Sequence, residues 1–274
     1  MRIDNRLLQL ELMKMMKVFH EICEKNNLTY YILGGTCLGA IRHKGFIPWD
    51  DDMDVGLPRA DYEKFFQIVS RECPLNIDLK CYRNTSQTPF HYIKFINNTT
   101  TLIESSYKKC VEGIYLDVFP LDGLKKYGII QKNRFRVIHF LHALVMNHFY
   151  TKENRKVINR FFEFIAKRIN PRKVHFILEC LMNRENLKEK PAFLCNFLGA
   201  WGEREIIPSS VFGAGKLYQF EDAMLYGPEN PDAYLRSLYG DYMQLPPEEK
   251  RVCKHDYFYI NLNKPYKEYK FNEG

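Results

Sequence analysis

The 274-residue sequence lacks a long apolar run, a paired-cysteine motif and a low-complexity linker. No apolar stretch approaches the ~20 residues of a membrane-spanning helix. The charged first segment, MRIDNRLLQLELMKMM, has no small-residue cleavage site, so we do not expect a secretory signal. None of the eight cysteines forms a C-x-x-C pair, which disfavours a zinc knuckle and favours free thiols. We therefore expect a globular protein of the reducing cytoplasm.

Positive charge is concentrated in one part of the chain. Residues 125–190 hold 16 Lys/Arg and 5 Glu, a local charge of +11, whereas the whole chain carries +7. Such a block favours anionic partners, namely phosphates, nucleic acid or an anionic membrane surface. The apolar stripe of residues 154–169 adds the hypothesis of peripheral contact at the inner membrane face. Nucleic acid is not expected, because the block has few glycines and no aromatic–basic RNA motif.

The pattern of apolar residues predicts alternating helices and strands. We expect helices at 5–26, 36–42, from Pro58, 133–150, 154–169 and 172–182, and strands at 29–33, 77–82, 90–95, 101–104 and 113–120. Strands mixed with helices in this order indicate an α+β fold. We distinguish three parts of the chain. They are a catalytic core at 1–124, a basic and mainly helical segment at 125–195, and a C-terminal segment at 196–274 that is expected to close the active site.

A glycine turn follows the first predicted strand. Gly34, Gly35 and Thr36 leave exposed backbone N–H groups, and the helix after them adds a positive N-terminal dipole. This combination can cradle a phosphate. The alternative is an ordinary strand-to-helix turn.

Four carboxylates follow within five positions, in the stretch WDDDMDV at 49–55. Such a run is costly unless it is solvated or neutralised, because the charges repel one another. In a strand, Asp52 and Asp54 point to the same side. Two carboxylates at one edge, beside a phosphate cradle, suit a divalent metal ion on a nucleotide. A solvated loop is the plainer alternative.

The segment IRHKGFIPWDDDMDVG resembles the LicD family of phosphotransferases, whose relatives include fukutin and fukutin-related protein. The resemblance returns in YLRSLYGDYMQLPPEEKR at 234–251, and it covers roughly the first 120 and last 60 residues. It implies a nucleotidyltransferase-like mixed sheet with flanking helices. It also implies metal-dependent transfer of phosphocholine from CDP-choline to a hydroxyl of a cell-surface glycan precursor of the teichoic acid, lipopolysaccharide or capsule type, with release of CMP.

The same resemblance suggests roles for further residues. Asp52 and Asp54 would hold Mg²⁺ or Mn²⁺. Asp117, alone in an apolar strand, would complete the metal site or accept the proton of the acceptor hydroxyl. The alternative for Asp117 is an edge-strand residue that faces water. Arg42, His43 and Lys94 are expected to contact the phosphates of the substrate. The alternative interpretation is that they are surface charges that balance nearby acidic residues. Asp122, in the sequence PLDG, is predicted to be a turn residue.

Other functions stay open on the sequence alone. The donor could carry ribitol phosphate, glycerol phosphate or phosphoethanolamine; the enzyme could be a true nucleotidyltransferase that releases pyrophosphate; or the basic segment could bind nucleic acid. A choline donor requires aromatic faces, because a trimethylammonium group has no N–H to donate. Candidates for such a wall are Tyr226, Tyr234, Tyr239 and Tyr242, with Glu221 and Asp241 as counter-charges and Trp49 beside the acidic run.

Overall fold

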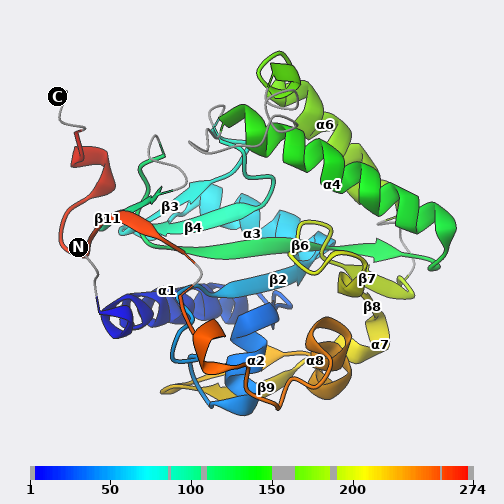
Figure 1. The fold of residues 1–274 in the computed structure, drawn as a ribbon, viewed down its shortest axis with the longest axis horizontal. Helices are drawn as coiled ribbons and strands as arrows, with labels where there is room; N and C mark the ends of the chain where they lie inside the picture. The colour runs from blue at the N-terminus through cyan, green and yellow to red at the C-terminus, as the bar shows by residue number, and fades with distance from the viewer. Residues whose placement is uncertain are drawn as a thin grey trace.

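The computed structural model describes residues 4–85, 88–105, 110–149, 164–185, 190–253 and 255–270. A mixed seven-stranded sheet forms its centre, with helices on its faces (Figure 1). Its strands are β1 (Tyr31–Ile32), β2 (Asp54–Pro58), β3 (Ile77–Lys80), β4 (Ile93–Asn97), β6 (Tyr115–Leu124), β7 (Phe193–Cys195) and β8 (Ile206–Pro208). The main order is β1-β2-β6-β4-β3, and β7 and β8 extend the sheet from β6. The predicted α+β class is confirmed.

Six helices longer than one turn surround the strands in the described residues. They are α1 (Asn5–Lys25), α2 (Gly34–Arg42), α3 (Arg59–Arg71), α4 (Ile129–Phe149), α6 (Pro171–Met182) and α8 (Pro231–Tyr239); α7 (Ser209–Phe212) is a single turn. Several boundaries differ from expectation. Helix α2 begins at Gly34, α3 follows Pro58 rather than including it, and α4 begins at Ile129. Among the strands, β1 and β3 are shorter than expected, β4 is shifted to Ile93–Asn97, and β6 begins at Tyr115 and runs on past 120 to Leu124.

The parallel pair of β2 and β6 positions the acidic residues. Its register places Asp54 opposite Asp117 and continues to Pro58 opposite Leu121. On its other side β6 pairs antiparallel with β4, so that Lys94 also lies opposite Asp117. Carboxylates 63 residues apart in sequence are therefore neighbours at one end of two hydrogen-bonded strands.

Helix α1 supports the acidic stretch from one side. Leu8, Leu12, Met16 and Phe19 are spaced to form one buried face, as the apolar pattern predicts. Its first turns also reach the chain before β2. The side-chain amides of Asn5 and Gln9 donate to the carbonyl oxygen of Asp50 at 3.0 and 2.9 Å. Packing and hydrogen bonding together fix the path of this stretch.

Asp122 lies in β6 and not in the turn predicted for it. It is fully buried and pairs with Arg59, the first residue of α3, through two hydrogen bonds of 2.7 and 2.8 Å. The prediction was wrong because the sequence PLDG also satisfies a turn pattern, whereas the actual partner is 63 positions away. The pair joins the C-terminal end of β6 to the residue directly after β2.

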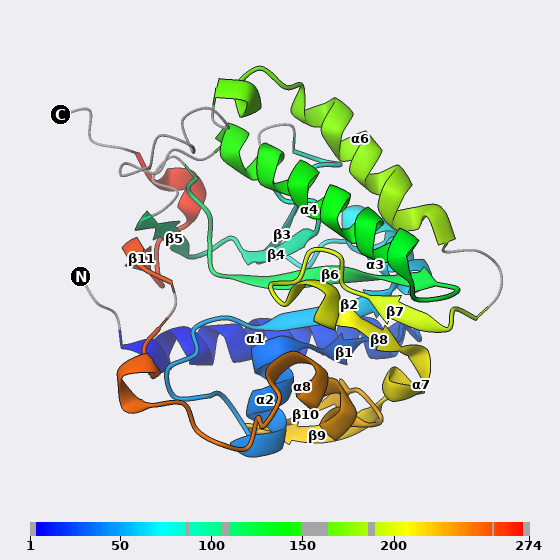
Figure 2. The same cartoon turned by 45° about the vertical axis from the view of Figure 1, so that its right-hand side comes forward.

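The basic segment contributes the helices α4 and α6, which lie side by side over one part of the sheet (Figure 2). Most of the helix predicted at 154–169 lies outside the described residues, and membrane contact stays a prediction. Among the described helices, none combines the length and apolar character needed to cross a bilayer.

A buried group of histidines connects α4 and α6 with the sheet. Nδ1 of His91 lies 3.0 Å from Nδ1 of His175, and its Nε2 lies 3.1 Å from Glu179. Burial lowers the pKa of His175 to about 4 and that of His142 to about 3, helped by the charges of neighbouring histidines. These rings are therefore neutral in the folded protein near neutral pH.

We expect acid to destabilise the protein through these histidines. Their folded pKa lies below the ordinary value of about 6.5, so the unfolded state binds more protons between pH 6.5 and pH 4, and stability falls as the pH drops through that window. By pH 5 each histidine should cost about 2 kcal/mol relative to pH 7. Urea unfolding at both pH values measures this loss. His142→Asn should reduce it, and an unchanged loss in that variant would contradict the assignment.

The C-terminal segment returns along the N-terminal part of the chain. Strands β9 (Lys216–Phe220) and β10 (Ala223–Gly227) form a hairpin, and β11 (Tyr257–Asn261) pairs antiparallel with β5 (Thr101–Glu104). Helix α8 follows the hairpin and packs against α2. Both ends of the chain thus contribute to the surroundings of β2.

Candidate functional site

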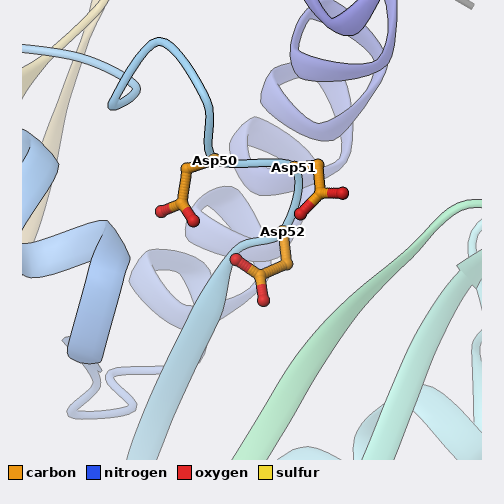
Figure 3. Close-up of side chains that lie close together, drawn as sticks. All are labelled: Asp50, Asp51 and Asp52. Carbon is orange, nitrogen blue, oxygen red and sulfur yellow. The ribbon is translucent and has the colours of Figure 1, made fainter. Parts of the chain in front are cut away.

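Three carboxylates lie together on the short stretch that leads into β2. Figure 3 shows the side chains of Asp50, Asp51 and Asp52 on this stretch, and one oxygen of each lies within 4.8 Å of the others. Asp50 is 8% exposed and Asp51 is 3% exposed, whereas Asp52 is half-buried. Like charges this close and this little hydrated repel strongly, which favours a cation among them.

Asp54 and Asp117 extend this acidic group across two strands. Burial raises the pKa of Asp54 well above its usual range, and the charges of Asp52 and Asp117 add to the rise. Burial also raises the pKa of Asp117 to about 7, although the nearby charge of Lys94 opposes the increase. The backbone N–H of Asp117 donates to the carbonyl of Met53 at 3.2 Å, so the two acidic segments are directly joined.

The donor set fits a hard divalent cation. In the part of the chain that the structure describes, Oδ1 of Asp117 and Oδ2 of Asp51 are buried without a hydrogen-bond donor. Carboxylate oxygens are the ligands that Mg²⁺ and Mn²⁺ prefer. The tightest trio is Asp50, Asp51 and Asp52, whereas the sequence predicts ligation by Asp52, Asp54 and Asp117. The metal-ligand assignments stay predictions.

The first turn of α2 lies against these carboxylates. The backbone N–H of Gly34 donates to the Tyr234 hydroxyl at 3.0 Å, and Thr36 accepts a 2.9 Å hydrogen bond from the N–H of Asp54. A Cβ on Gly35 would stand 2.6 Å from an oxygen of Asp50, so a larger residue would push this carboxylate away from the helix. The positive end of the helix thus faces Asp50 and Asp54. A phosphate contact of this turn remains a prediction.

Two of the predicted basic contacts lie at the other end of α2. Nη1 of Arg42 donates to the carbonyl of Tyr242 at 2.6 Å, and its charge interacts with Asp50 and Tyr239. His43 follows it and meets the ring of Trp49 edge-to-face, with centroids 6.4 Å apart. Burial, followed by the charge of Arg42, lowers the pKa of His43. Arg42 is therefore held between the acidic group and the C-terminal segment.

Lys94 is almost fully enclosed, at 2% exposed. Its Nζ lies 2.9 Å from Glu112 and 3.4 Å from the centroid of the Tyr115 ring. Burial favours its neutral form, but Glu112 and Asp117 outweigh this and raise its pKa to about 12. Lys94 thus holds a positive charge behind Asp117. Its predicted phosphate contact is not tested by this placement.

Sequence reasoning missed two C-terminal side chains in this region. Nδ1 of His255 lies 2.9 Å from Oδ1 of Asp51. Burial favours neutral His255, but the hydrogen bond to Asp51 and the charge of Asp52 prevail and raise its pKa to about 9. Glu205 is 6% exposed; burial raises its pKa to about 7, and its charge acts on Asp54. No spacing pattern links residues so far apart in the chain.

The predicted aromatic wall is dispersed in the structure. Tyr234 is buried against α2, and Tyr226 packs on the rings of His20 and Tyr30. Tyr242 is 7% exposed, and its hydroxyl donates to Asp232. Trp49 has the guanidinium of Arg251 over its ring, and Glu221 pairs with Arg6 at 2.6 Å. Tyr239 differs from them. Its hydroxyl lies 3.7 Å from the point where a Cβ on Gly34 would stand, and its ring meets that of Trp201.

Comparison with known proteins identifies the class of this domain. Residues 27–136 match the family model described as LicD/FKTN/FKRP, nucleotidyltransferase domain, and this range contains the acidic stretch, α2 and Asp117. The chain is 26% identical over 263 residues to the lipopolysaccharide cholinephosphotransferase LicD of Haemophilus influenzae, with 90% of this chain and 94% of that protein covered. Residues 27–136 therefore match the LicD/FKTN/FKRP family model, and the resemblance seen in the sequence is confirmed for this part of the chain.

Two shorter matches concern proteins without an assigned activity. An uncharacterized protein of Rickettsia typhi is 45% identical over 71 residues, and one of Rickettsia prowazekii is 48% identical over 60 residues. These matches cover 26% and 22% of this chain and 23% of each relative. They indicate a segment of sequence that this chain shares with the two proteins.

Proposed function

We propose that this protein is a phosphotransferase that moves phosphocholine from CDP-choline to a hydroxyl of a glycan precursor and releases CMP. The carrying observation is the acidic group at the β2–β6 pair, which lies beside the start of α2 within the matched family domain. The full-length similarity to a lipopolysaccharide cholinephosphotransferase supports the choice of transferred group and acceptor class.

Transfer would break the bond between the choline-bearing phosphorus and the oxygen that links it to CMP, and would form a bond from that phosphorus to the acceptor oxygen. The Asp residues at 50–54, with Asp117, would hold Mg²⁺ or Mn²⁺, which supplies charge neutralisation for the diphosphate and the leaving CMP. Arg42 would contact a phosphate oxygen from the far end of α2.

The acceptor hydroxyl must lose a proton as the new bond forms. Asp117 would take this role where the Asp residues at 50–54 hold the ion without it, because burial raises its pKa and makes its carboxylate a stronger base. Lys94 behind it would stabilise the carboxylate form, since the two residues face each other across β4 and β6. His255 would orient Asp51 through its 2.9 Å contact.

A donor screen tests this function. CDP-choline, CDP-ethanolamine, CDP-ribitol and CDP-glycerol are each incubated with Mg²⁺ or Mn²⁺ and one glycan acceptor preparation, and CMP and the acceptor mass are followed. We expect CMP release to be fastest with CDP-choline, with phosphocholine added to the acceptor.

Three other outcomes of the screen would each support a different function. Faster turnover of a polyol donor would reject choline while retaining CDP-dependent transfer. Pyrophosphate from CTP would indicate a nucleotidyltransferase. Salt-sensitive RNA binding without turnover of any donor would reject the enzyme assignment altogether.

A further inference from the structure

Two aromatic rings from separate segments form a corner beside the acidic group. The ring of Trp201 meets that of Tyr239 at 73°, with centroids 4.7 Å apart. Trp201 is 36% exposed and Tyr239 is half-buried, so this pair keeps contact with solvent. Among the aromatic residues considered for a cation-binding wall, Tyr234 and Tyr242 are buried, and the ring of Trp49 already has Arg251 over it.

The corner is held rigidly. Nη1 of Arg204 donates to the carbonyl of Leu238 at 3.1 Å, and the hydroxyl of Ser237 donates to the carbonyl of Arg204 at 3.0 Å. These two hydrogen bonds attach the turn after Trp201 to helix α8, which ends at Tyr239. Because the segments that carry the two rings are joined, a ligand would lose less binding free energy in ordering them than if the segments were independent.

A carboxylate stands behind the corner. Oε1 of Glu205 accepts a hydrogen bond from the backbone N–H of Trp201 at 3.3 Å, and the charge of Glu205 acts on both Tyr239 and Asp54. The Tyr239 hydroxyl and Oδ2 of Asp54 both lie within 4 Å of the point where a Cβ on Gly34 would stand. One end of the corner is therefore next to the site proposed for the phosphates.

We propose that Trp201 and Tyr239, backed by Glu205, bind the quaternary ammonium group of the transferred phosphocholine. This inference rests on the proposed function and assigns its donor selectivity to particular residues. A trimethylammonium group offers no N–H, so it is recognised through π-faces and a nearby negative charge. Two rings at a steep angle supply the faces, and Glu205 supplies the charge, because a bound cation favours the ionised form of its buried carboxyl. A neutral polyol gains nothing from either.

Donor selectivity is the direct test. The measured quantity is the ratio of kcat/KM for CDP-choline to that for CDP-glycerol. Trp201→Leu keeps an apolar side chain without a π-face and should lower this ratio about tenfold. Trp201→Phe should retain most of the ratio, and Tyr239→Phe, which keeps the ring, should retain it as well. The control Phe176→Leu, which removes an exposed ring on α6, should leave the ratio unchanged. An unchanged ratio in a folded Trp201→Leu protein overturns the proposal.

A binding measurement decides the question if no donor releases CMP. The chain has two tryptophans, so Trp49→Phe leaves Trp201 as the single tryptophan, whose fluorescence is excited selectively at about 295 nm, where tyrosine no longer absorbs. Titration with tetramethylammonium chloride should change its fluorescence saturably, whereas sodium chloride and glycerol at matched concentrations should not. In that case the corner binds the cation although the proposed function has failed. Identical responses to all three solutes would overturn the proposal.

Discussion

Asp54→Asn should lower kcat by about 10³-fold or more, because charge stabilisation is the main catalytic contribution in phosphoryl transfer. Asparagine keeps the shape of the side chain and its place opposite Asp117 in the β2–β6 register. It removes one negative charge from a group whose purpose would be to hold a divalent cation on the diphosphate. Steady-state CMP release with saturating donor and Mg²⁺ measures the effect. Retention of more than about a tenth of kcat would contradict the assignment.

The same substitution should stabilise the metal-free fold. Burial and the charges of Asp52 and Asp117 raise the pKa of Asp54, so its ionised form is unfavourable in the folded state. Removing that charge relieves repulsion, and the melting temperature without divalent cations should rise. A loss of activity together with higher stability separates a catalytic role from misfolding.

Metal binding gives a third readout for Asp54. A cation that binds the folded state at a hundred times its Kd stabilises it by about 2.7 kcal/mol. Mn²⁺ should therefore raise the melting temperature of the wild type, and this rise should shrink in Asp54→Asn. The matched control is Asp222→Asn, which removes a carboxylate paired with Lys17 on the surface. It should keep both the activity and the response to Mn²⁺.

The sequence was informative about the local elements that surround the site. Apolar spacing predicted α1 and α6, and the Asp-x-Asp pattern drew attention to the start of β2. The lone carboxylate in an apolar strand pointed to Asp117, which lies opposite Asp54. The predictions of these elements succeeded because hydrophobic periodicity is a local property of the chain. The roles of Asp54 and Asp117 at a metal site stay predictions.

The rest depends on contacts that no local pattern encodes. His255 reaches Asp51 across 204 positions, and Tyr234 reaches Gly34 across 200. Tyrosines in the C-terminal segment look alike in sequence, but their burial separates Tyr239 from Tyr234 and Tyr242. The alternative of an exposed charge is wrong for Lys94, which is buried and pairs with Glu112. That burial depends on the central place of β4 in the sheet, which no local pattern encodes, and the phosphate contact of Lys94 stays a prediction.

The ion pair of Arg59 and Asp122 connects stability with the geometry of the site. Arg59 directly follows β2, and Asp122 lies near the end of β6, so the pair joins the strands at the end away from Asp54 and Asp117. Both residues are shielded from water, at 5% and 0% exposed. Arg59 also contacts Glu63 and Glu179 at 3.2 Å each, which places its charge in a larger network.

Asp122→Asn should destabilise the protein by about 3 kcal/mol, because removing one partner of a buried pair leaves the other charge poorly compensated. Glu63 and Glu179 remain near Arg59, and their presence keeps the loss at the lower end of the usual range for such pairs. The matched control is Asp232→Asn, which breaks the exposed pair with Arg236 on α8 and should cost much less, because water and salt screen exposed pairs. Urea unfolding at pH 7 measures both variants. Equal losses would show that burial does not strengthen the Arg59–Asp122 pair, and its proposed contribution to stability would have to be abandoned.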